Sequence, residues 1–552
     1  IFRQKCREYA QRQVDGQMND FIRLGVFAEW NHPYLTMDNE FEANIIRSLG
    51  KVIENGHLIK GYKPVYWSVV GASALAETEV EYQDKESFSI DVAFSVSDEE
   101  TFSKAINNIS GTGDIFVVIW TTTPWTIPSN QAVCLNPDLN YVLLACKPSG
   151  AVFGRYLVAE ELVESLLSRW QIKDFEVVGS TKGDQLELQS LEHPFYNREV
   201  PIILGDHVNT EAGTGCVHTA PDHGVEDFMI AEKYEIKTLN YINDNGVFNE
   251  NVEYFAGEHV YKVDTSVLDL LKDKEKLISS NKFIHSYAHC WRTKTPLIYR
   301  ATPQWFISMT KNNLLEKAKK IVPDISWYPD WGRARIDGML ENSPDWCISR
   351  QRTWGVPITI FVNNSTGDIH PEMPRLIEII ASGVEKNGIE FWHEMDKKTL
   401  LGDQAKDYSK VSDTLDVWFD SGVTHAAVLD HREQLKFPAD LYLEGSDQHR
   451  GWFQSSLKTS LALRDSSPYK AVMTHGFVVD AMGHKMSKSL GNVLPPQQII
   501  NDQGADVLRL WVAATDCSGE MTVSEEILKR TGDSYRRIRN TARFFLSNLD
   551  DF

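Results

Sequence analysis

The amino-acid sequence predicts an α/β protein in which a core with a parallel sheet is interrupted by a large β-rich insert and followed by the start of a helical region. Residues 439–479 follow the order strand, loop, helix and strand, which is that of a βαβ unit. Across residues 80–264 the pattern changes to short strands separated by turns rich in Gly, Asn and Asp. Residues 1–62 show apolar positions at the three-to-four spacing of helices. The clearest strands of the insert are 115–119, 141–145 and 200–204.

Within the predicted βαβ unit, residues 439–443 are expected to form a buried strand, 448–463 a helix and 471–479 a second strand. Ligands of such units bind at the carboxyl ends of the strands. Polar residues at these ends are therefore candidates for a binding site. Glu444, Gly445, Asp447 and Gln448 lie at one such end, and His475 follows another. A glycine lets the backbone approach a ligand closely, and the carboxylate and amide suit a ribose or an adenylate.

Size and composition indicate a multidomain protein outside the membrane. The chain has 552 residues, of which 42% are hydrophobic and 24% charged, and this suggests three or four domains. No apolar run approaches the roughly 18 residues that span a bilayer, so we expect no membrane segment and a cytoplasmic location. Seven scattered cysteines indicate free thiols.

A net charge of −21 excludes a protein whose whole surface binds nucleic acid, but a local basic stripe is present. Arg536, Arg539 and Arg543 recur at i, i+3 and i+7 on a predicted helix. The stripe can bind RNA or be a solvated helix face, and the sequence leaves both open.

The segment from 475 to 492 sets two lysines in a loop flanked by glycines. Lys485 and Lys488 are three residues apart, so both ammonium groups can reach one anionic ligand such as a polyphosphate. Gly483 and Gly491 leave the backbone of the loop free to move. A solvated turn would be the alternative for a lone pair of lysines at this spacing.

Residues 485–489, Lys-Met-Ser-Lys-Ser, match the signature loop of class I aminoacyl-tRNA synthetases. Residues 444–452 resemble the isoleucyl-tRNA synthetases in particular, and residues 347–355 and 415–422 point the same way. The resemblance implies a Rossmann-like core that uses ATP with Mg²⁺, isoleucine and tRNA(Ile), in a monomer. It further implies that Lys485, Lys488 and His475 contact ATP, that Trp418 and Trp452 wall the amino-acid pocket, and that Glu444, Gly445, Asp447 and Gln448 hold the aminoacyl-adenylate.

Two further clusters lie in the β-rich insert and suit the hydrolysis of an ester next to an ammonium group. Residues 120–130 form a hydroxyl-rich loop after a strand, and residues 213–227 form a glycine-rich turn with histidines and acids. Asp227 can pair with an amine, threonine hydroxyls can orient water, and His218 can exchange protons near neutral pH. Either cluster alone would be an ordinary turn. Together they resemble the editing domain of the isoleucyl, valyl and leucyl enzymes, with these candidate residues: Thr121, Thr122, Thr123, Thr126, Asn130, His218 and Asp227.

The resemblance implies a domain layout for the whole chain. The expected parts are 1–80, the rest of the first half of the catalytic core and the base of the insert; 81–282, the editing domain; 283–410, connecting α/β segments; 411–500, the second half of the core with the lysine loop; and 501–552, a stem-contact region and the start of a helical anticodon-binding domain. No His-Ile-Gly-His motif, which this family also needs, occurs in the sequence. We expect it to lie upstream of Ile1, so that the chain alone would not activate isoleucine at a normal rate.

Some relatives bind zinc through paired C-x-x-C elements at the base of the insert. The matching positions here are Ser68, Gly71, Cys290 and Thr293. One cysteine of four cannot form a structural zinc site, so no zinc is expected at these positions. Three alternatives remain open: a valyl-type synthetase, a deacylase that acts alone, and a nucleic-acid-binding module without chemistry.

Overall fold

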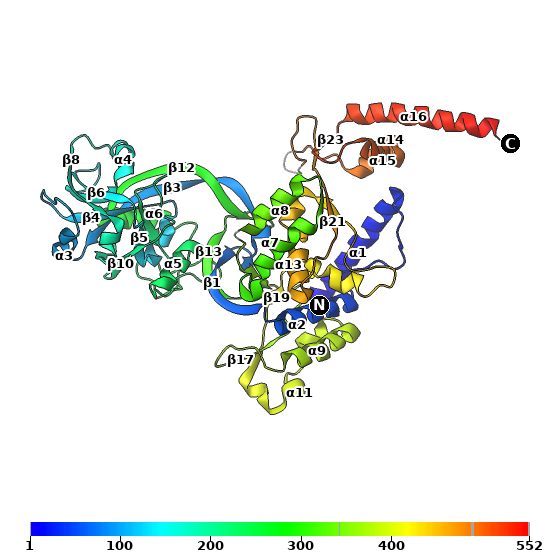
Figure 1. Ribbon diagram of the computed structural model, residues 1–552, viewed down its shortest axis with the longest axis horizontal. Coiled ribbons are helices and arrows are strands. Elements are labelled where there is room, and N and C mark those ends of the chain that lie inside the picture. Colours follow the sequence, from blue (N-terminus) through cyan, green and yellow to red (C-terminus); the bar gives the residue numbers. More distant parts are fainter. Residues whose placement is uncertain (1, 342, 487–490, 550–552) are drawn as a thin grey trace. The chain divides into compact units, whose positions relative to one another are not determined.

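The computed structural model describes residues 2–341, 343–486 and 491–549. The chain forms two compact units, one made of Ile1–Ile59 with Trp305–Phe552 and the other of Lys60–Gln304 (Figure 1). In the described part of the chain, no helix has both the length and the apolar character needed to cross a bilayer.

The first unit holds a three-stranded parallel sheet in the order β14-β21-β20. Its strands are β14 (Ser326–Tyr328), β20 (Tyr442–Gly445) and β21 (Ala471–His475). Helix α13 (Trp452–Arg464) connects β20 to β21, so the predicted βαβ unit is confirmed. The helix begins four residues later than predicted, because Ser446–His449 form a 3-10 turn first.

The prediction of a buried strand at 439–443 is wrong in two respects. Regular pairing begins only at Tyr442, and Leu441 and Leu443 are 46% and 51% exposed. Side chains alternate between the two faces of a strand. Tyr442 is buried against Trp452, whereas Leu441 and Leu443, on the opposite face of the strand, are about half exposed.

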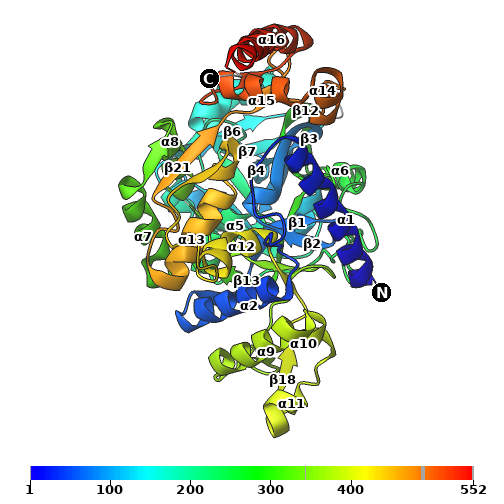
Figure 2. The same ribbon diagram turned by 90° about the vertical axis from the view of Figure 1, so that its right-hand side faces the viewer.

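The first unit also contains further helices. They are α1 (Phe2–Arg23), α2 (Asn39–Glu54), α7 (Leu314–Ile321), α8 (Trp331–Glu341), α9 (Met373–Asn387), α10 (Glu390–Glu394), α11 (Lys398–Leu401) and α12 (Val417–Gly422). Short strands lie between them: β15 (Trp346–Cys347), β16 (Ser349–Arg350), β17 (Phe361–Asn363), β18 (Tyr408–Lys410) and β19 (Thr414–Leu415). Helix α2 lies next to α9 (Figure 2), and a Cβ at Gly50 would come within 2.6 Å of Ile377. The glycine therefore allows the two helices to pack closely.

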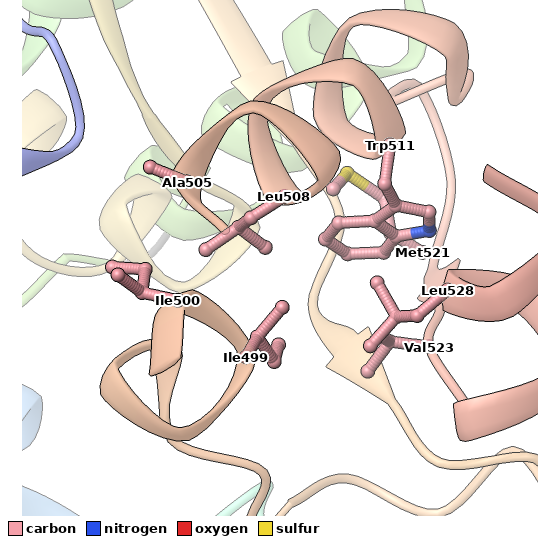
Figure 3. Close-up of a cluster of buried hydrophobic side chains, with 8 residues drawn as sticks. All are labelled: Ile499, Ile500, Ala505, Leu508, Trp511, Met521, Val523 and Leu528. Carbon is pink, nitrogen blue, oxygen red and sulfur yellow. The ribbon is translucent and has the colours of Figure 1, made fainter. Parts of the chain in front are cut away.

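The end of the first unit contains a separate apolar cluster (Figure 3). It is formed by α14 (Pro496–Gln503), α15 (Ala505–Ala514), β23 (Met521–Thr522) and the start of α16 (Glu525–Asn548). Strand β22 (Val478–Val479) pairs with β23, which ties the segment before the lysine loop to this cluster. The predicted helix at the end of the chain is confirmed as α16, on which Arg536, Arg539 and Arg543 are exposed.

The second unit is rich in strands, as predicted. They are β1 (Leu58–Ser68), β2 (Ser73–Leu75), β3 (Val80–Val96), β4 (Ile115–Thr121), β5 (Ala132–Leu135), β6 (Asn140–Cys146), β7 (Gly154–Ala159), β8 (Phe175–Lys182), β9 (Ser190–Glu192), β10 (Glu199–Leu204), β11 (Cys216–Thr219), β12 (Leu277–Cys290) and β13 (Ile298–Ile307), of which β1 and β13 run across the unit boundary. Four helices accompany them: α3 (Glu99–Lys104), α4 (Val163–Arg169), α5 (Val225–Lys233) and α6 (Asp264–Asp273). The predicted strands 115–119, 141–145 and 200–204 correspond to β4, β6 and β10.

The main sheet of this unit closes on itself. Its strands run in the order β12-β3-β9-β10-β5-β11-β4-β7-β6-β8, and β3 also pairs with β4. The path β3-β9-β10-β5-β11-β4 is therefore a closed ring, with fully buried side chains such as Phe94, Ile119, Leu135 and Ile203. Closure removes free sheet edges. Strand β3 continues beyond the ring and pairs with β12 as two long antiparallel ribbons (Figure 1).

Candidate functional site

The second unit contains a pocket of about 330 Å³ that gathers most of the predicted hydrolytic residues. Six of the seven line it: Thr121, Thr122, Thr123, Thr126, His218 and Asp227. Asn130 lies behind the wall, where it is buried and hydrogen-bonded to His218.

Strand order explains why two segments about a hundred residues apart meet at this pocket. Strands β4 and β11 are parallel neighbours, with Val217 opposite Trp120. Parallel neighbours end at the same edge of a sheet. The threonine loop that follows β4 and the segment that follows β11 therefore emerge side by side.

The ring of His218 is held at both nitrogens. Nδ1 lies 2.7 Å from the side-chain nitrogen of Asn130, and Nε2 lies 2.9 Å from the hydroxyl of Thr126. The same Asn130 nitrogen donates to the carbonyl of Ala132 at 2.9 Å, and a carbonyl can only accept, so the orientation of the amide is fixed. Asn130 therefore donates to Nδ1, and the imidazole carries its proton on Nε2.

This arrangement corrects the expectation that His218 exchanges protons near neutral pH. Burial, with smaller contributions from His223 and Arg198, lowers the pKa of His218 to about 3. The ring is neutral at physiological pH, and both nitrogens are already engaged. In this geometry His218 orients Thr126.

The threonine hydroxyls continue the hydrogen-bonded chain along the wall. Thr126 donates to the carbonyl of Thr123 at 2.8 Å, so its oxygen is free to accept from His218. The hydroxyls of Thr126 and Thr123 are 3.3 Å apart, and those of Thr123 and Thr121 are 3.2 Å apart. The loop thus presents a row of ordered hydroxyl groups to the pocket.

Asp227 lies in the first turn of α5. Its Oδ2 accepts a hydrogen bond from the backbone N–H of Ala220 at 2.8 Å. Burial raises the pKa of Asp227 to about 7 even though that hydrogen bond favours the charged form. A bound cation would favour the carboxylate, so this group suits the recognition of an ammonium ion.

The glycine-rich turn forms another part of the wall. Gly213 and Gly215 have φ values of +87° and +78°, which only glycine adopts readily. Three successive carbonyls of this turn each accept a hydrogen bond from a different element: Gly213 from Arg169, Thr214 from the backbone of Ala159, and Gly215 from the hydroxyl of Tyr141. Arg169 is itself paired with the buried Asp91 at 2.7 Å.

The other lining residues were not named as candidates, although all except His207, Asn209 and Ala212 lie in the two predicted clusters. They are Trp120, His207, Asn209, Ala212, Gly213, Thr214, Gly215, Cys216, Val217, Ala220 and His223. His223 is held by the carbonyl of Tyr299 and the hydroxyl of Ser129. His207 and Asn209 follow β10, and no motif in the sequence marks them.

The first unit brings together the residues predicted to bind an adenylate. Gly445 at the end of β20 lies opposite His475 at the end of β21. A Cβ at Gly445 would come within 2.7 Å of Asp447 Oδ1 and 3.5 Å of the His475 ring. The glycine, acid and imidazole thus lie at one edge of the parallel sheet, where ligands of such sheets bind. Glu444 precedes Gly445 in β20 and is exposed.

Gln448 and the two tryptophans form a group beside that edge. The side-chain oxygen of Gln448 accepts a hydrogen bond from the backbone of Trp452 at 3.0 Å. A Cβ at Gly451 would lie 2.7 Å from this oxygen and 2.8 Å from the ring of Trp418. The indole of Trp452 stacks on Tyr442, with ring centroids 3.9 Å apart, and donates to the carbonyl of Ser421 at 3.0 Å.

Residues 485 and 486 and the base of the lysine loop are among the described residues. The ammonium group of Lys485 lies 3.8 Å from the centroid of the Phe477 ring. Asp480 accepts from the backbones of Met482 and His484 and from the side chain of Asn492, which closes the base of the loop. Lys488 lies outside the described residues.

A buried ion pair that was not predicted holds the segment that carries Trp418 in place. Arg350 in β16 and Asp416 before α12 are 3.1 Å apart, with 2% and 0% of their side chains exposed. Asp416 also accepts from the backbone of Trp418 at 3.2 Å. The pair joins two of the segments on which the family resemblance rests, 347–355 and 415–422.

The positions that match the zinc ligands of some relatives form two turns held by hydrogen bonds. The backbone of Gly71 donates to Ser68 Oγ at 3.0 Å, and that of Thr293 donates to Cys290 Sγ at 3.5 Å. Among the residues that the structure describes, no three His, Cys, Asp or Glu side chains gather as metal ligands would.

Known proteins match the chain along its whole length. The chain is 63% identical over 551 residues to an isoleucine–tRNA ligase of Saccharophagus degradans and 62% identical over 551 residues to one of Teredinibacter turnerae. Each match covers 100% of this chain, which spans 59% and 58% of the lengths of those two proteins. A solved ternary complex of LeuRS, tRNA and LeuAMS from Agrobacterium radiobacter K84 aligns with 98% of this chain and 65% of its own, with 16% identity and a TM-score of 0.44. The family model of class I tRNA synthetases (I, L, M and V) matches residues 1–524, and the chain therefore belongs to this family.

Proposed function

We propose that the chain is the part of an isoleucine–tRNA ligase that holds the editing pocket and the second half of the synthetic site. The whole protein would join isoleucine to tRNA(Ile) with ATP and Mg²⁺, and the pocket of the second unit would hydrolyse valine attached in error. The names of the relatives at 55–63% identity support isoleucine as the amino acid. The observation that carries the editing proposal is the pocket that brings the threonine loop and Asp227 together.

The chemistry of the pocket fits an aminoacyl ester. Its α-ammonium group would pair with Asp227, and the row of threonine hydroxyls would orient a water molecule and the terminal ribose. The water oxygen attacks the carbonyl carbon, the bond from that carbon to the ribose oxygen breaks, and the ribose oxygen takes up a proton. Amino acid and free tRNA are released.

A second site is needed because size alone separates isoleucine from valine poorly. One methylene contributes only about 1–3 kcal/mol of discrimination, a limit for which the isoleucine enzymes are themselves the usual example. A hydrolytic pocket that accepts the smaller amino acid can then correct the errors of the synthetic site.

For the synthetic site we propose the roles that the family resemblance implies. Trp418 and Trp452 would wall the isoleucine pocket, and Glu444, Gly445, Asp447 and Gln448 would hold the adenylate. His475, Lys485 and Lys488 would contact ATP. The register of β20 and β21 supports the grouping of Gly445 with His475.

The domain layout is proposed on the same basis. The parts are 1–80 and 411–500 for the core, 81–282 for editing, 283–410 for the connection between them, and 501–552 for contacts with the tRNA stem and the start of an anticodon-binding domain. We also propose a cytoplasmic monomer. All seven cysteines are free, which suits a reducing compartment.

A valine enzyme is the nearest alternative, and residues 444–452 argue against it together with the names of the relatives. Amino-acid-dependent ATP–pyrophosphate exchange by the full-length protein separates the two. Isoleucine should support exchange at concentrations at which valine is a poor substrate, and the reverse order would assign the protein to valine.

The editing proposal is tested with the 552-residue chain and two substrates, valyl-tRNA(Ile) and isoleucyl-tRNA(Ile). The chain should release valine well above the rate without protein and release isoleucine much more slowly. Equal rates for both substrates, or no release of valine, would contradict the proposal.

A further inference from the structure

Arg198 lies next to the threonine loop, residues 120–130, without lining the pocket. One terminal nitrogen of its guanidinium donates to the carbonyls of both Pro128 and Asn130, the first at 2.9 Å. The other donates to the hydroxyl of Tyr241 at 3.4 Å. The guanidinium group thus holds the backbone at the end of the threonine loop.

His193 holds the same stretch of backbone. It directly follows β9, and its Nδ1 accepts from the backbone N–H of Tyr196 at 3.2 Å. Its Nε2 therefore carries the proton and donates to the carbonyl of Ile127 at 3.1 Å. His193 and Arg198, which lie in one short segment, thus hold three backbone carbonyls of the threonine loop, those of Ile127, Pro128 and Asn130.

The backbone that Arg198 holds carries the side chain that fixes His218. Asn130 donates to Nδ1 of His218, which leaves the ring proton on Nε2 to be donated to Thr126. Thr126 in turn belongs to the row of hydroxyls that faces the pocket. Arg198 therefore holds the backbone of Asn130, and the side chain of Asn130 is linked through His218 to Thr126 on the pocket wall.

The positive charge of Arg198, like its hydrogen bonds, favours the arrangement in which His218 is neutral. Among the described residues it forms no ion pair with a carboxylate: its hydrogen-bond partners are carbonyls and a hydroxyl, and its guanidinium group lies 5.2 Å from the centroid of the Tyr196 ring. Its positive charge contributes to the lowered pKa of His218, after burial and His223. A neutral imidazole is the form that can accept from Asn130 and donate to Thr126 at the same time.

We propose that Arg198 is a positioning residue of the hydrolytic pocket, which acts through the backbone of residues 128–130 to keep Asn130, His218 and Thr126 in the arrangement described. The proposal deepens the editing function and rests on it for the readout of hydrolysis. It predicts a loss of turnover when Arg198 is replaced, since displacements of about 1 Å at a reacting group can cost roughly 100-fold in rate.

A purely structural role for Arg198 is the competing explanation, and the chain offers a matched control. Arg155 in β7 is also a largely buried arginine, donates to the carbonyl of Gly113 at 2.8 Å and pairs with Glu99. It does not line the pocket. Arg155→Met should therefore lower stability without a selective effect on hydrolysis.

The experiment compares Arg198→Met, Arg155→Met and the parent as full 552-residue chains. Hydrolysis of valyl-tRNA(Ile) gives kcat and KM, thermal unfolding gives stability, and added guanidinium at low millimolar concentration tests for rescue. Chains labelled with ¹⁵N-histidine report the tautomer of His218, whose signal is assigned by its loss in His218→Gln. Arg198→Lys replaces Arg198→Met if the latter does not fold.

We expect Arg198→Met to lose roughly 10- to 100-fold in kcat with KM nearly unchanged, to regain part of it with guanidinium, and to lose the single Nε2–H tautomer of His218. Unchanged kcat and tautomer in Arg198→Met, or an equal loss of kcat in Arg155→Met, would overturn the proposal. If the parent itself does not hydrolyse the substrate, the editing function fails. The tautomer of His218 then tests the positioning role without the hydrolysis assay. A change of tautomer in Arg198→Met but not in Arg155→Met supports the positioning role, and no change in Arg198→Met overturns it.

Discussion

Asp227 Oδ2 accepts a hydrogen bond from the backbone N–H of Ala220 at 2.8 Å, while Oδ1 has no hydrogen-bond or ion-pair partner among the described residues. One oxygen thus anchors the carboxyl group to the wall, and the other remains available to a ligand. Burial raises the pKa of this group to about 7. The ionisation of Asp227 should therefore affect both the stability of the protein and its activity near neutral pH.

The effect on stability has a definite sign. The pKa of Asp227 is about 7 in the folded protein, against an ordinary value of 3.8, so its contribution to stability is full below about pH 3.8 and is lost as the pH rises through 7. Asp227→Asn keeps an acceptor for Ala220 and cannot ionise. The variant should therefore gain stability over the parent from pH 5 to pH 8, by at most about 1.4 kcal/mol per pKa unit. Urea denaturation at both pH values measures the difference, and the same difference at both would contradict the pKa assignment.

The pH dependence of hydrolysis should follow the same group. An ammonium group binds to the carboxylate and not to the neutral acid, so kcat/KM for valyl-tRNA(Ile) should rise as the pH increases through about 7. The acidic limb should disappear in Asp227→Asn, whose activity should be low at every pH. Rates from about pH 5.5 to 8 measure the profile. An acidic limb that persists in the variant would assign the titration to another group.

The glycine turn gives a prediction with an internal control. Gly215 and Gly257 both have a φ of +78°, but a Cβ at Gly215 would lie 2.3 Å from the Cβ of Ala159, whereas nothing lies within 4 Å at Gly257. Gly257→Ala should cost about 1 kcal/mol through its backbone conformation. Gly215→Ala adds a clash and should cost a further 1–3 kcal/mol or so. Chemical denaturation measures the unfolding free energy of both variants. Equal losses would show that the turn at Gly215 accommodates the added methyl group without a clash.

The buried pair of Arg350 and Asp416 predicts a large effect in the first unit. Removing one partner leaves a charge buried without compensation, so Arg350→Met should destabilise this unit by about 3–5 kcal/mol. The exposed pair of Lys282 and Glu86 is the contrast, and Lys282→Met should cost less than about 1 kcal/mol. Chemical denaturation followed by tryptophan fluorescence compares them, and similar losses would contradict the role assigned to the buried pair.

Local pattern in the sequence was enough for some of this structure. The βαβ unit, the strands at 115–119, 141–145 and 200–204, and the helix with Arg536 were predicted from periodicity alone. The meeting of the threonine loop with Asp227 was not accessible to periodicity, since it depends on β4 and β11 being parallel neighbours. Family resemblance supplied that grouping.

Other features depend on contacts that no short motif encodes. The proton exchange expected of His218 is wrong because Asn130 and Thr126 engage both ring nitrogens in a buried site. Leu443 was expected to be buried, but burial depends on whether another layer covers its face. Arg198 and His207 belong to no recognisable motif, so only the folded structure shows that they lie beside the pocket.

The central claim is that the pocket of the second unit hydrolyses a mischarged tRNA through an anchor at Asp227. The most direct measurement is the rate at which the 552-residue chain releases valine from valyl-tRNA(Ile), compared with Asp227→Ala and with Asp273→Ala, an exposed acid in α6 outside the pocket. We expect release by the parent and by Asp273→Ala, and a loss of at least about 100-fold in Asp227→Ala. Release by Asp227→Ala at the parental rate would contradict it.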